Sequence, residues 1–235
     1  MKKLLISIII PCFNEKKTIC KIIDKINKQK NIKKEIILVD DFSTDGTRLL
    51  IKKKLSKKIK KIIFHKKNLG KGASIRSAQK HVKGNIVIIQ DADLEYNPKD
   101  YQNIFKPIIN KKTKVVYGSR VLGKKRYKSK NFISIFRIFG NHLLTLASNL
   151  VNNQKLTDAH TCYKAFEAKI FKKFDLKEDG FSFCPEVTTK LSNMNINILE
   201  VPISYNGRDV DQGKKIRFLD AIKAIKALIT YKLFK

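Results

Sequence analysis

Three acidic residues that follow one apolar run are the clearest candidates for chemistry in this sequence. Asp91, Asp93 and Glu95 come shortly after the run at 86–89, in a chain of 235 residues with only 20 Asp and Glu. Asp91 and Asp93 alternate along an extended backbone, so both side chains face the same side. Carboxylates placed in this way bind a divalent cation that also holds a diphosphate. The alternative is a solvated acidic turn, which the scarcity of acidic residues argues against.

Two other apolar runs also end in polar residues. The run at 8–10 leads into Asn14 and Glu15, which on their own are better explained as a turn and a helix N-cap. A second run ends at Asp40. A carboxylate fixed at a strand tip can accept hydrogen bonds from the N–H edge of a nucleobase. That role and a purely local one are equally open for Asp40.

Short runs rich in β-branched residues alternate with longer helical patterns through the first half of the chain. This alternation predicts an α/β fold with a mainly parallel sheet flanked by helices. In such a sheet the carboxyl ends of the strands form the ligand crevice, which is where the three polar clusters fall. We expect strands at 4–10, 35–40, 61–65, 85–90 and 115–119, and helices near 16–29, 46–57, 71–83 and 98–110.

The second half of the chain has a different pattern. It contains an amphipathic stretch at 131–152, a polar segment at 156–164, a helix near 185–194, a strand at 198–204, a polar loop at 206–215 and an amphipathic helix at 218–234. No repeat or linker separates the two halves. We therefore expect one catalytic domain over residues 1–217 and a C-terminal amphipathic helix over 218–235.

Positive charge dominates the composition. Lys and Arg number 51 against 20 Asp and Glu, a formal net charge of +31, and 43% of the residues are hydrophobic. This content excludes a disordered or fibrous chain and allows a sizeable core. The charge indicates either a coding bias toward Lys or attraction to an anionic membrane or nucleic acid. Because the chain has no recognisable nucleic-acid-binding motif, we expect no nucleic acid partner.

The cysteines and the apolar runs bear on location. The four cysteines form no CxxC pair, so we expect neither a zinc site nor a disulfide framework, and a reducing cytoplasm is the simpler home. The apolar run at 4–10 is too short to span a membrane, and the apolar window at 132–151 contains Arg137. We therefore expect no transmembrane helix.

Several motifs in a fixed order carry a family resemblance. IIIPCFNE, VDDFSTDGT, NLGKGASI and QDADLEY together resemble the nucleotide-sugar domain of family 2 inverting glycosyltransferases. The later segments VVYGSR, TDAHTCYKAF, GFSFCPE and EVPISYNGR, followed by GKKIR, are similar to the dolichyl- or undecaprenyl-phosphate sugar transferase branch, which includes dolichol-phosphate mannosyltransferases. The resemblance covers most of residues 5–217. It implies a single GT-A type domain with a Rossmann-like sheet.

The resemblance implies a donor site at the strand ends. It assigns a GDP- or UDP-sugar to Pro11, Phe13, Glu15, Asp40, Lys71, Asp91 and Ala92. Asp40 would contact the base, with Lys71 nearby. Asp91, Asp93 and Glu95 would hold Mg2+ or Mn2+ on the donor diphosphate. The branch often has Gln where this chain has Glu95, and both supply an oxygen ligand.

The resemblance also implies an acceptor side. Its residues are Ser119, Arg120, His160 and Glu186. Arg120 offers bidentate geometry to a phosphate, although it can also be an ordinary surface cation, and a structural role is equally open for His160. Arg208 and Lys214 match a loop that closes over the donor pyrophosphate. Catalysis would fall to Asp93, Arg120, Asp158, Arg208 and Lys214.

The implied reaction is displacement at the anomeric carbon of the sugar by a phosphate oxygen of a polyprenyl phosphate. It proceeds with inversion and with a metal-stabilised nucleoside diphosphate as leaving group. If the acceptor is instead a sugar hydroxyl, as in polysaccharide, lipopolysaccharide or glycolipid synthesis, Asp158 is the first candidate for the base. A metal-dependent nucleotidyltransferase is a further alternative, which would not explain VVYGSR, TDAHTCYKAF and GFSFCPE.

A polyprenyl acceptor requires contact with a membrane. The amphipathic stretches at 131–152 and 218–234 would dock the protein peripherally on an anionic surface, the inner face of the cytoplasmic membrane. Two alternatives stay open. The terminal helix can pack on the core with a solvated Lys face, or a separate membrane protein partner can give access to the acceptor.

Overall fold

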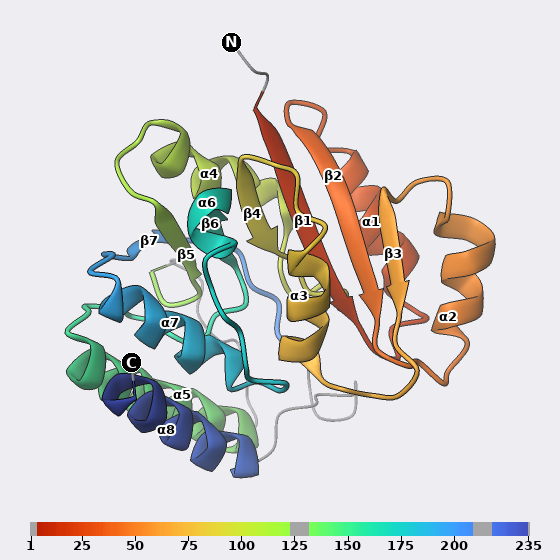
Figure 1. Ribbon diagram of the computed structural model, residues 1–235. Helices are drawn as coiled ribbons and strands as arrows, with labels where there is room; N and C mark the ends of the chain where they lie inside the picture. Colours follow the sequence, from red (N-terminus) through yellow and green to blue (C-terminus); the bar gives the residue numbers. More distant parts are fainter. Residues whose placement is uncertain (1–3, 123–131, 209–217, 235) are drawn as a thin grey trace.

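The structure, a computed structural model, describes residues 4–122, 132–208 and 218–234. Within these residues seven strands form one sheet in the order β3-β2-β1-β4-β6-β5-β7 (Figure 1). The strands are β1 (Leu5–Cys12), β2 (Lys33–Asp40), β3 (Lys61–Phe64), β4 (Ile86–Ile89), β5 (Val115–Ser119), β6 (Lys164–Glu167) and β7 (Leu199–Pro202). β1 pairs in parallel with β2 and β4, β2 with β3, and β5 with β7. The predicted mainly parallel sheet is confirmed.

One strand was not predicted from the sequence. β6 runs antiparallel between β4 and β5, where the polar residues before it indicate only a loop. Its first residue, Lys164, is fully buried. The sheet tolerates this because Nζ donates to the Ala159 carbonyl oxygen at 2.8 Å and lies 3.5 Å from the centre of the Tyr117 ring. A run of four residues that begins with a lysine carries too little apolar periodicity to predict a strand.

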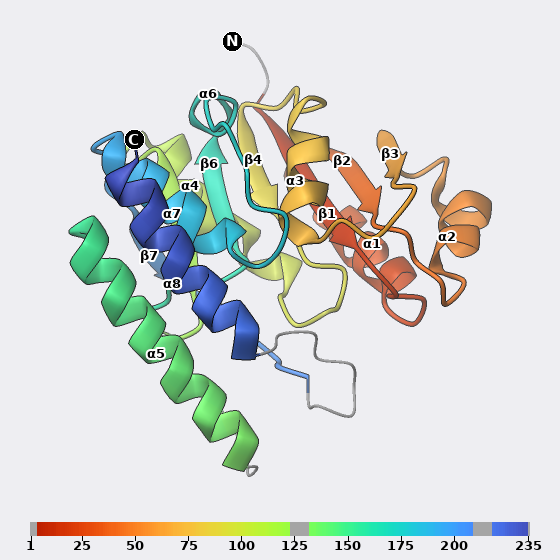
Figure 2. The same ribbon diagram turned by 60° about the horizontal axis from the view of Figure 1, so that its bottom comes forward.

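Helices cover both faces of the sheet (Figure 2). They are α1 (Ile19–Asn27), α2 (Thr47–Leu50), α3 (Lys71–Gln79), α4 (Tyr101–Ile109), α5 (Phe132–Asn152), α6 (Ala168–Phe171), α7 (Phe183–Asn193) and α8 (Phe218–Leu233), with a π-helical turn η1 (Ile51–Leu55) and a 3-10 turn η2 (Pro98–Asp100). Alternate side chains of β1 point to opposite faces. Ile8 and Ile10 belong to one core cluster with residues of α1 and α4, and Ile9 belongs to a second cluster with residues of α3 and α7. Each such buried isoleucine stabilises the fold by about 1.5–3 kcal/mol.

α5 and α8 form a helix pair beside the sheet. They lie side by side, and α8 also packs along α7 (Figures 1 and 2). The Tyr231 hydroxyl of α8 donates to Glu178 Oε1 at 3.0 Å, and the Tyr231 carbonyl oxygen accepts from Asn193 of α7 at 2.8 Å. In the described part of the chain, no helix has both the length and the apolar character needed to cross a bilayer.

Candidate active site

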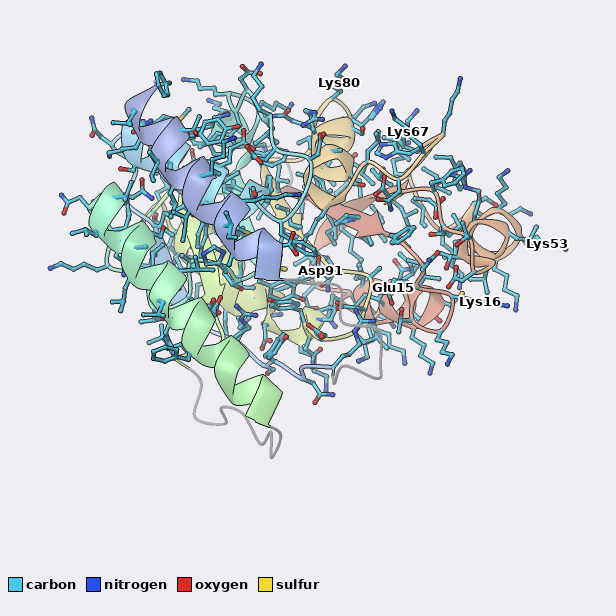
Figure 3. The ribbon with its side chains drawn as sticks, turned by 90° about the horizontal axis from the view of Figure 1, so that it is seen from below. Glu15, Lys16, Lys53, Lys67, Lys80 and Asp91 are labelled. Carbon is cyan, nitrogen blue, oxygen red and sulfur yellow. The ribbon has the colours of Figure 1, made fainter. Side chains whose placement is uncertain are left out.

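The carboxyl ends of β1, β2 and β4 bring the predicted donor residues to one edge of the sheet. Glu15 follows β1, Asp40 ends β2 and Asp91 follows β4, and β1 lies between the other two strands. Seen from this edge, Asp91 and Glu15 lie on the same face of the protein (Figure 3). Three more of the predicted donor residues belong to the same strand ends: Pro11, Phe13 and Ala92.

Asp40 is fully buried at the tip of β2. Its Oδ2 accepts from Arg48 Nε at 2.7 Å, while Oδ1 is buried and has no hydrogen-bond partner among the described residues. A buried carboxylate oxygen without a partner is costly, and a donor on a bound ligand would satisfy it. No sequence signal marks Arg48, whose guanidinium lies 5.5 and 5.1 Å from the ring centres of Phe42 and Phe64. This geometry suits the predicted contact with a nucleobase.

Lys71 begins α3, and its ammonium contacts the predicted metal ligand Asp91. Nζ donates to Asp91 Oδ1 at 2.5 Å and to Cys162 Sγ at 2.8 Å. Burial works against the charged amine, but the neighbouring carboxylate of Asp91 raises the pKa of Lys71 above its ordinary value. Lys71 is therefore a cation held at Asp91. Cys162 is a neighbour of this pair that the sequence did not reveal.

Arg208 connects the acidic residues of the site. Nη2 donates to Asp93 Oδ2 at 3.0 Å and Nη1 to Glu15 Oε1 at 3.2 Å, and the backbone N–H of Arg208 donates to Glu95 Oε1 at 2.8 Å. A residue that follows β7 thus joins the ends of β1 and β4. Despite this pairing, burial and the charges of Asp91 and Glu95 raise the pKa of Asp93 to about 7.

The predicted metal ligands lie together but are paired with basic side chains. Within the described residues, no three acidic, His or Cys side chains converge into a ready-made metal cluster. Asp91 contacts Lys71 and Asp93 contacts Arg208 instead. Four carboxylates share two basic side chains here, those of Lys71 and Arg208, and Mg2+ and Mn2+ prefer carboxylate oxygens. The chemistry of the donor set therefore fits a divalent cation.

Arg120 and Asp158 form a buried ion pair after β5. Nε and Nη2 of Arg120 donate to Oδ2 and Oδ1 of Asp158 at 2.6 and 2.7 Å. Burial alone would raise the pKa of Asp158, but Arg120 lowers it to about 2. Asp158 is thus placed to orient Arg120 and is poorly suited to act as the base that was predicted for a hydroxyl acceptor. The Arg120 guanidinium lies 5.1 Å from the Tyr205 ring centre, and the Tyr205 hydroxyl donates to Glu95, which links the two sides of the site.

Two other predicted acceptor residues lie near this pair. Ser119 Oγ hydrogen-bonds Thr157 Oγ1 at 2.7 Å and accepts from the backbone N–H of Val121 at 3.1 Å, so it shapes the turn that carries Arg120. His160 Nε2 is buried and has no partner among the described residues. Burial lowers the pKa of His160 to about 4, so its ring is neutral at pH 7. A neutral ring nitrogen without a partner is compatible with the predicted acceptor contact.

Glu186 is fully buried on α7 and supports a loop. Oε1 accepts from the backbone N–H of Lys177 and from Lys190 Nζ, both at 2.6 Å, and Oε2 accepts from the backbone N–H of Glu178 at 3.0 Å. These are the contacts of a residue that fixes residues 177–178 rather than of one that binds an acceptor. The predicted residue Lys214 lies outside the described residues.

The sheet order and the strand-end site define the class of the protein, a GT-A-like α/β fold. A solved structure of glucosyl-3-phosphoglycerate synthase from Mycobacterium tuberculosis, in complex with Mn2+, UDP and glucosyl-3-phosphoglycerate, has the same fold. The TM-score is 0.71 at 16% identity, over 99% of this chain and 81% of that chain. The predicted fold class is confirmed.

Sequence comparison then gives the family. Residues 7–175 match the model of glycosyl transferase family 2, and the chain belongs to this family of glycosyltransferases. It is 28% identical to the UDP-N-acetylglucosamine–dolichyl-phosphate N-acetylglucosaminyltransferase of Methanococcus voltae, over 98% of this chain and 97% of the relative. It is 27% identical to the dolichyl-phosphate beta-glucosyltransferase of Saccharomyces cerevisiae, over 99% and 75%. The predicted family is confirmed, and these relatives support the predicted branch.

Proposed function

We propose that the chain transfers a sugar from a nucleotide sugar to a polyprenyl phosphate such as dolichyl phosphate, with inversion at the anomeric carbon. The observation that carries the proposal is the buried Arg120–Asp158 pair, which Tyr205 connects to the acidic donor edge. The pair fixes the Arg120 guanidinium where the phosphate of the acceptor would meet the nucleotide sugar. The relatives similar along nearly the whole chain are named as dolichyl-phosphate sugar transferases.

A phosphate acceptor needs little help from a base. One of its oxygens is anionic near pH 7 and attacks the anomeric carbon, while the bond from that carbon to the donor diphosphate breaks and the nucleoside diphosphate leaves with the electron pair. Lys71 and Arg208 would neutralise charge on that leaving group. Mg2+ or Mn2+, held by Asp91 and Asp93, would supply further neutralisation when bound. The low pKa of Asp158 argues against a hydroxyl acceptor, which needs a base.

Donor binding is tested by thermal unfolding with a panel of UDP- and GDP-sugars in the presence of Mn2+. The matching donor, at about 100 times its Kd, should raise the free energy of unfolding by about 2.7 kcal/mol. Asp40→Asn should lose most of this gain, because the variant replaces the proposed acceptor of the base N–H. Asp24→Asn, a change in an exposed ion pair with Lys58, should retain it. The donor site is refuted if no nucleotide sugar stabilises the wild-type chain.

The outside of the α5–α8 pair is apolar. Leu146 and Leu150 of α5 are 64% and 87% exposed, while Thr145 and Ser148 of the same helix are buried. A helix whose outer face meets water exposes its polar residues and buries its apolar ones, so the pattern of α5 is reversed. On α8 the exposed apolar side chains recur at helical spacing: Ile222, Ile225, Ile229 and Leu233. The two helices together present an apolar surface that a lipid phase would cover.

We propose that this surface docks on an anionic bilayer. Lys223 and Lys226 are exposed beside Ile222 and Ile225, in a chain with a formal net charge of +31. The apolar side chains would enter the headgroup region, and each basic residue near an anionic surface contributes about 1 kcal/mol. In Figure 1 the α5–α8 pair lies on the side of the molecule toward which β1 and β2 point, so docking would bring the acceptor lipid to the side that carries the site.

Liposome flotation tests the docking surface. The wild-type chain should float with anionic vesicles at low salt, less at high salt, and poorly with neutral vesicles. The double variant Leu146→Glu/Ile229→Glu should lose flotation, because it places charge on both helices of the surface. Leu49→Glu changes a residue of α2 that is 57% exposed, and it should float as the wild type does. Equal recovery of the double variant and the wild type would mean that α5 and α8 do not carry the membrane contact.

A further inference from the structure

Asp41 is a buried carboxylate without a substrate role in the proposed mechanism. Its Oδ2 accepts from the backbone N–H of Gly70 at 2.7 Å, and its Oδ1 accepts from the backbone N–H of Leu69 at 2.9 Å. The same Oδ1 lies 2.7 Å from His65 Nδ1, and His65 Nε2 lies 2.9 Å from Ser77 Oγ of α3. Asp41 therefore holds the turn before α3 from the side of β2.

The opposite side of this turn packs against the backbone of residues 178–179. A Cβ at Gly72 would collide with the Glu178 carbonyl oxygen, and a Cβ at Gly70 with that of Asp179. The two glycines thus allow a close backbone approach, and the backbone N–H of Ala73 donates to Asp179 O at 3.1 Å. The buried carboxylate of Glu186 fixes this loop, because it accepts from the backbone N–H groups of residues 177 and 178.

Lys71 is the residue that these two sets of contacts hold between them. It lies between Gly70 and Gly72, and its ammonium meets Asp91 Oδ1 at 2.5 Å. Because α3 starts at Lys71, a shift of the turn would move the start of the helix and the ammonium with it. The ion pair with Asp91 therefore depends on how firmly the turn is held.

We infer that Asp41 and Glu186 are positioning residues that hold the 68–72 turn from two sides and so place the Lys71 ammonium against Asp91. The inference rests on the proposed function, in which Asp91 lies at the donor diphosphate. Neither carboxylate touches substrate in this scheme. Both act on the donor site through Lys71, whereas a residue that only stabilised the fold would not depend on Lys71.

A double-mutant cycle on sugar transfer tests the inference. Asp41→Asn places an amide where Leu69, Gly70 and His65 all need an acceptor, so it should raise the KM for the nucleotide sugar by about tenfold. Lys71→Met should raise the same KM by a similar factor. Because Asp41 acts through Lys71, the double variant should be no worse than Lys71→Met alone. Glu186→Gln should behave like Asp41→Asn in the same cycle.

Glu35→Gln is the matched control. Glu35 is also a buried carboxylate, and it accepts from Ser7 Oγ at 2.6 Å and from the backbone N–H groups of Lys83 and Gly84 at 2.7 and 3.1 Å, at the other end of the sheet. Its variant should lower the free energy of unfolding but leave the donor KM unchanged. If Asp41→Asn does not fold, Ser77→Ala takes its place in the cycle, because it removes only the outer hydrogen bond to His65.

The outcomes separate this inference from the proposed function. If the wild-type chain transfers no sugar, the proposed function fails and the inference falls with it. If the wild type is active but the effects of Asp41→Asn and Lys71→Met add, or Glu35→Gln raises the donor KM equally, the inference alone is overturned. The inference is supported if the donor KM of the double variant equals that of Lys71→Met alone.

Discussion

Asp93→Asn is expected to lower sugar transfer by about a thousandfold and to leave the chain folded. Asp93 lies at the proposed diphosphate site and pairs with Arg208 at 3.0 Å. The substitution removes a charged ligand to the divalent cation and the acidic partner of Arg208. Steady-state transfer at matched Mn2+ concentration measures the loss. Asp24→Asn, in the exposed ion pair with Lys58, should keep the wild-type rate.

The stability of this variant has a predicted sign. Burial and neighbouring carboxylates raise the folded-state pKa of Asp93 to about 7, whereas in the unfolded chain it has its ordinary value near 4. Between these values the folded chain binds more protons, so Asp93 makes the fold less stable as pH rises from about 4 to about 7. Without metal, Asp93→Asn should therefore be at least as stable as the wild type at pH 8. Urea unfolding at pH 5 and pH 8 measures this, and a less stable variant at pH 8 would show that the ion pair with Arg208 outweighs the repulsion.

The paired substitution Arg120→Met/Asp158→Asn is expected to lower acceptor use by about a hundredfold and to change the donor KM by less than about threefold. Both partners are changed because Arg120→Ala alone would leave Asp158 buried and unpaired, at a cost of about 3–5 kcal/mol. Removing both charges together preserves the fold better. The expected loss follows from the missing guanidinium, the proposed partner of the acceptor phosphate.

The measurement compares the KM values for polyprenyl phosphate and for nucleotide sugar in one preparation. Lys58→Met/Asp24→Asn removes an exposed ion pair of the same chain and should change neither value. An equal loss of donor affinity in the Arg120 variant would assign Arg120 to the donor side of the site. Unchanged use of the lipid acceptor would remove Arg120 from the acceptor site altogether.

Local patterns were enough to predict most of the sheet. β5 has the predicted bounds, and β1 and β2 differ from theirs by no more than two residues at either end, because a run of β-branched residues is a property of neighbouring positions. β6 could not be found in this way. Its first residue is a buried lysine that is stabilised by the Ala159 carbonyl oxygen and the Tyr117 ring, and these contacts come from other parts of the chain.

The candidate site, like the sheet, was predicted only where neighbouring residues determine the structure. Motif order predicted which residues reach the strand ends, such as Asp40 at the end of β2 and Glu15 three positions after β1. Side-chain pairing depends on distant segments, as in the contact of Arg208 with Glu15 across 193 positions of sequence. For a hydroxyl acceptor the sequence suggested Asp158 as the base, and it suggested an acceptor contact for Glu186. The structure shows Asp158 in an ion pair with Arg120 and Glu186 in contact with the backbone at 177–178.

The central claim is that the sugar moves to a lipid phosphate, and product analysis tests it most directly. The wild-type chain is incubated with sugar-labelled nucleotide sugar, a polyprenyl phosphate and Mn2+, and the products are extracted into organic solvent. We expect the label in the lipid phase as a sugar phosphodiester of inverted anomeric configuration, with one nucleoside diphosphate released per sugar, and no such product from Asp93→Asn. Label that reaches a saccharide hydroxyl but never the lipid phosphate would contradict the claim.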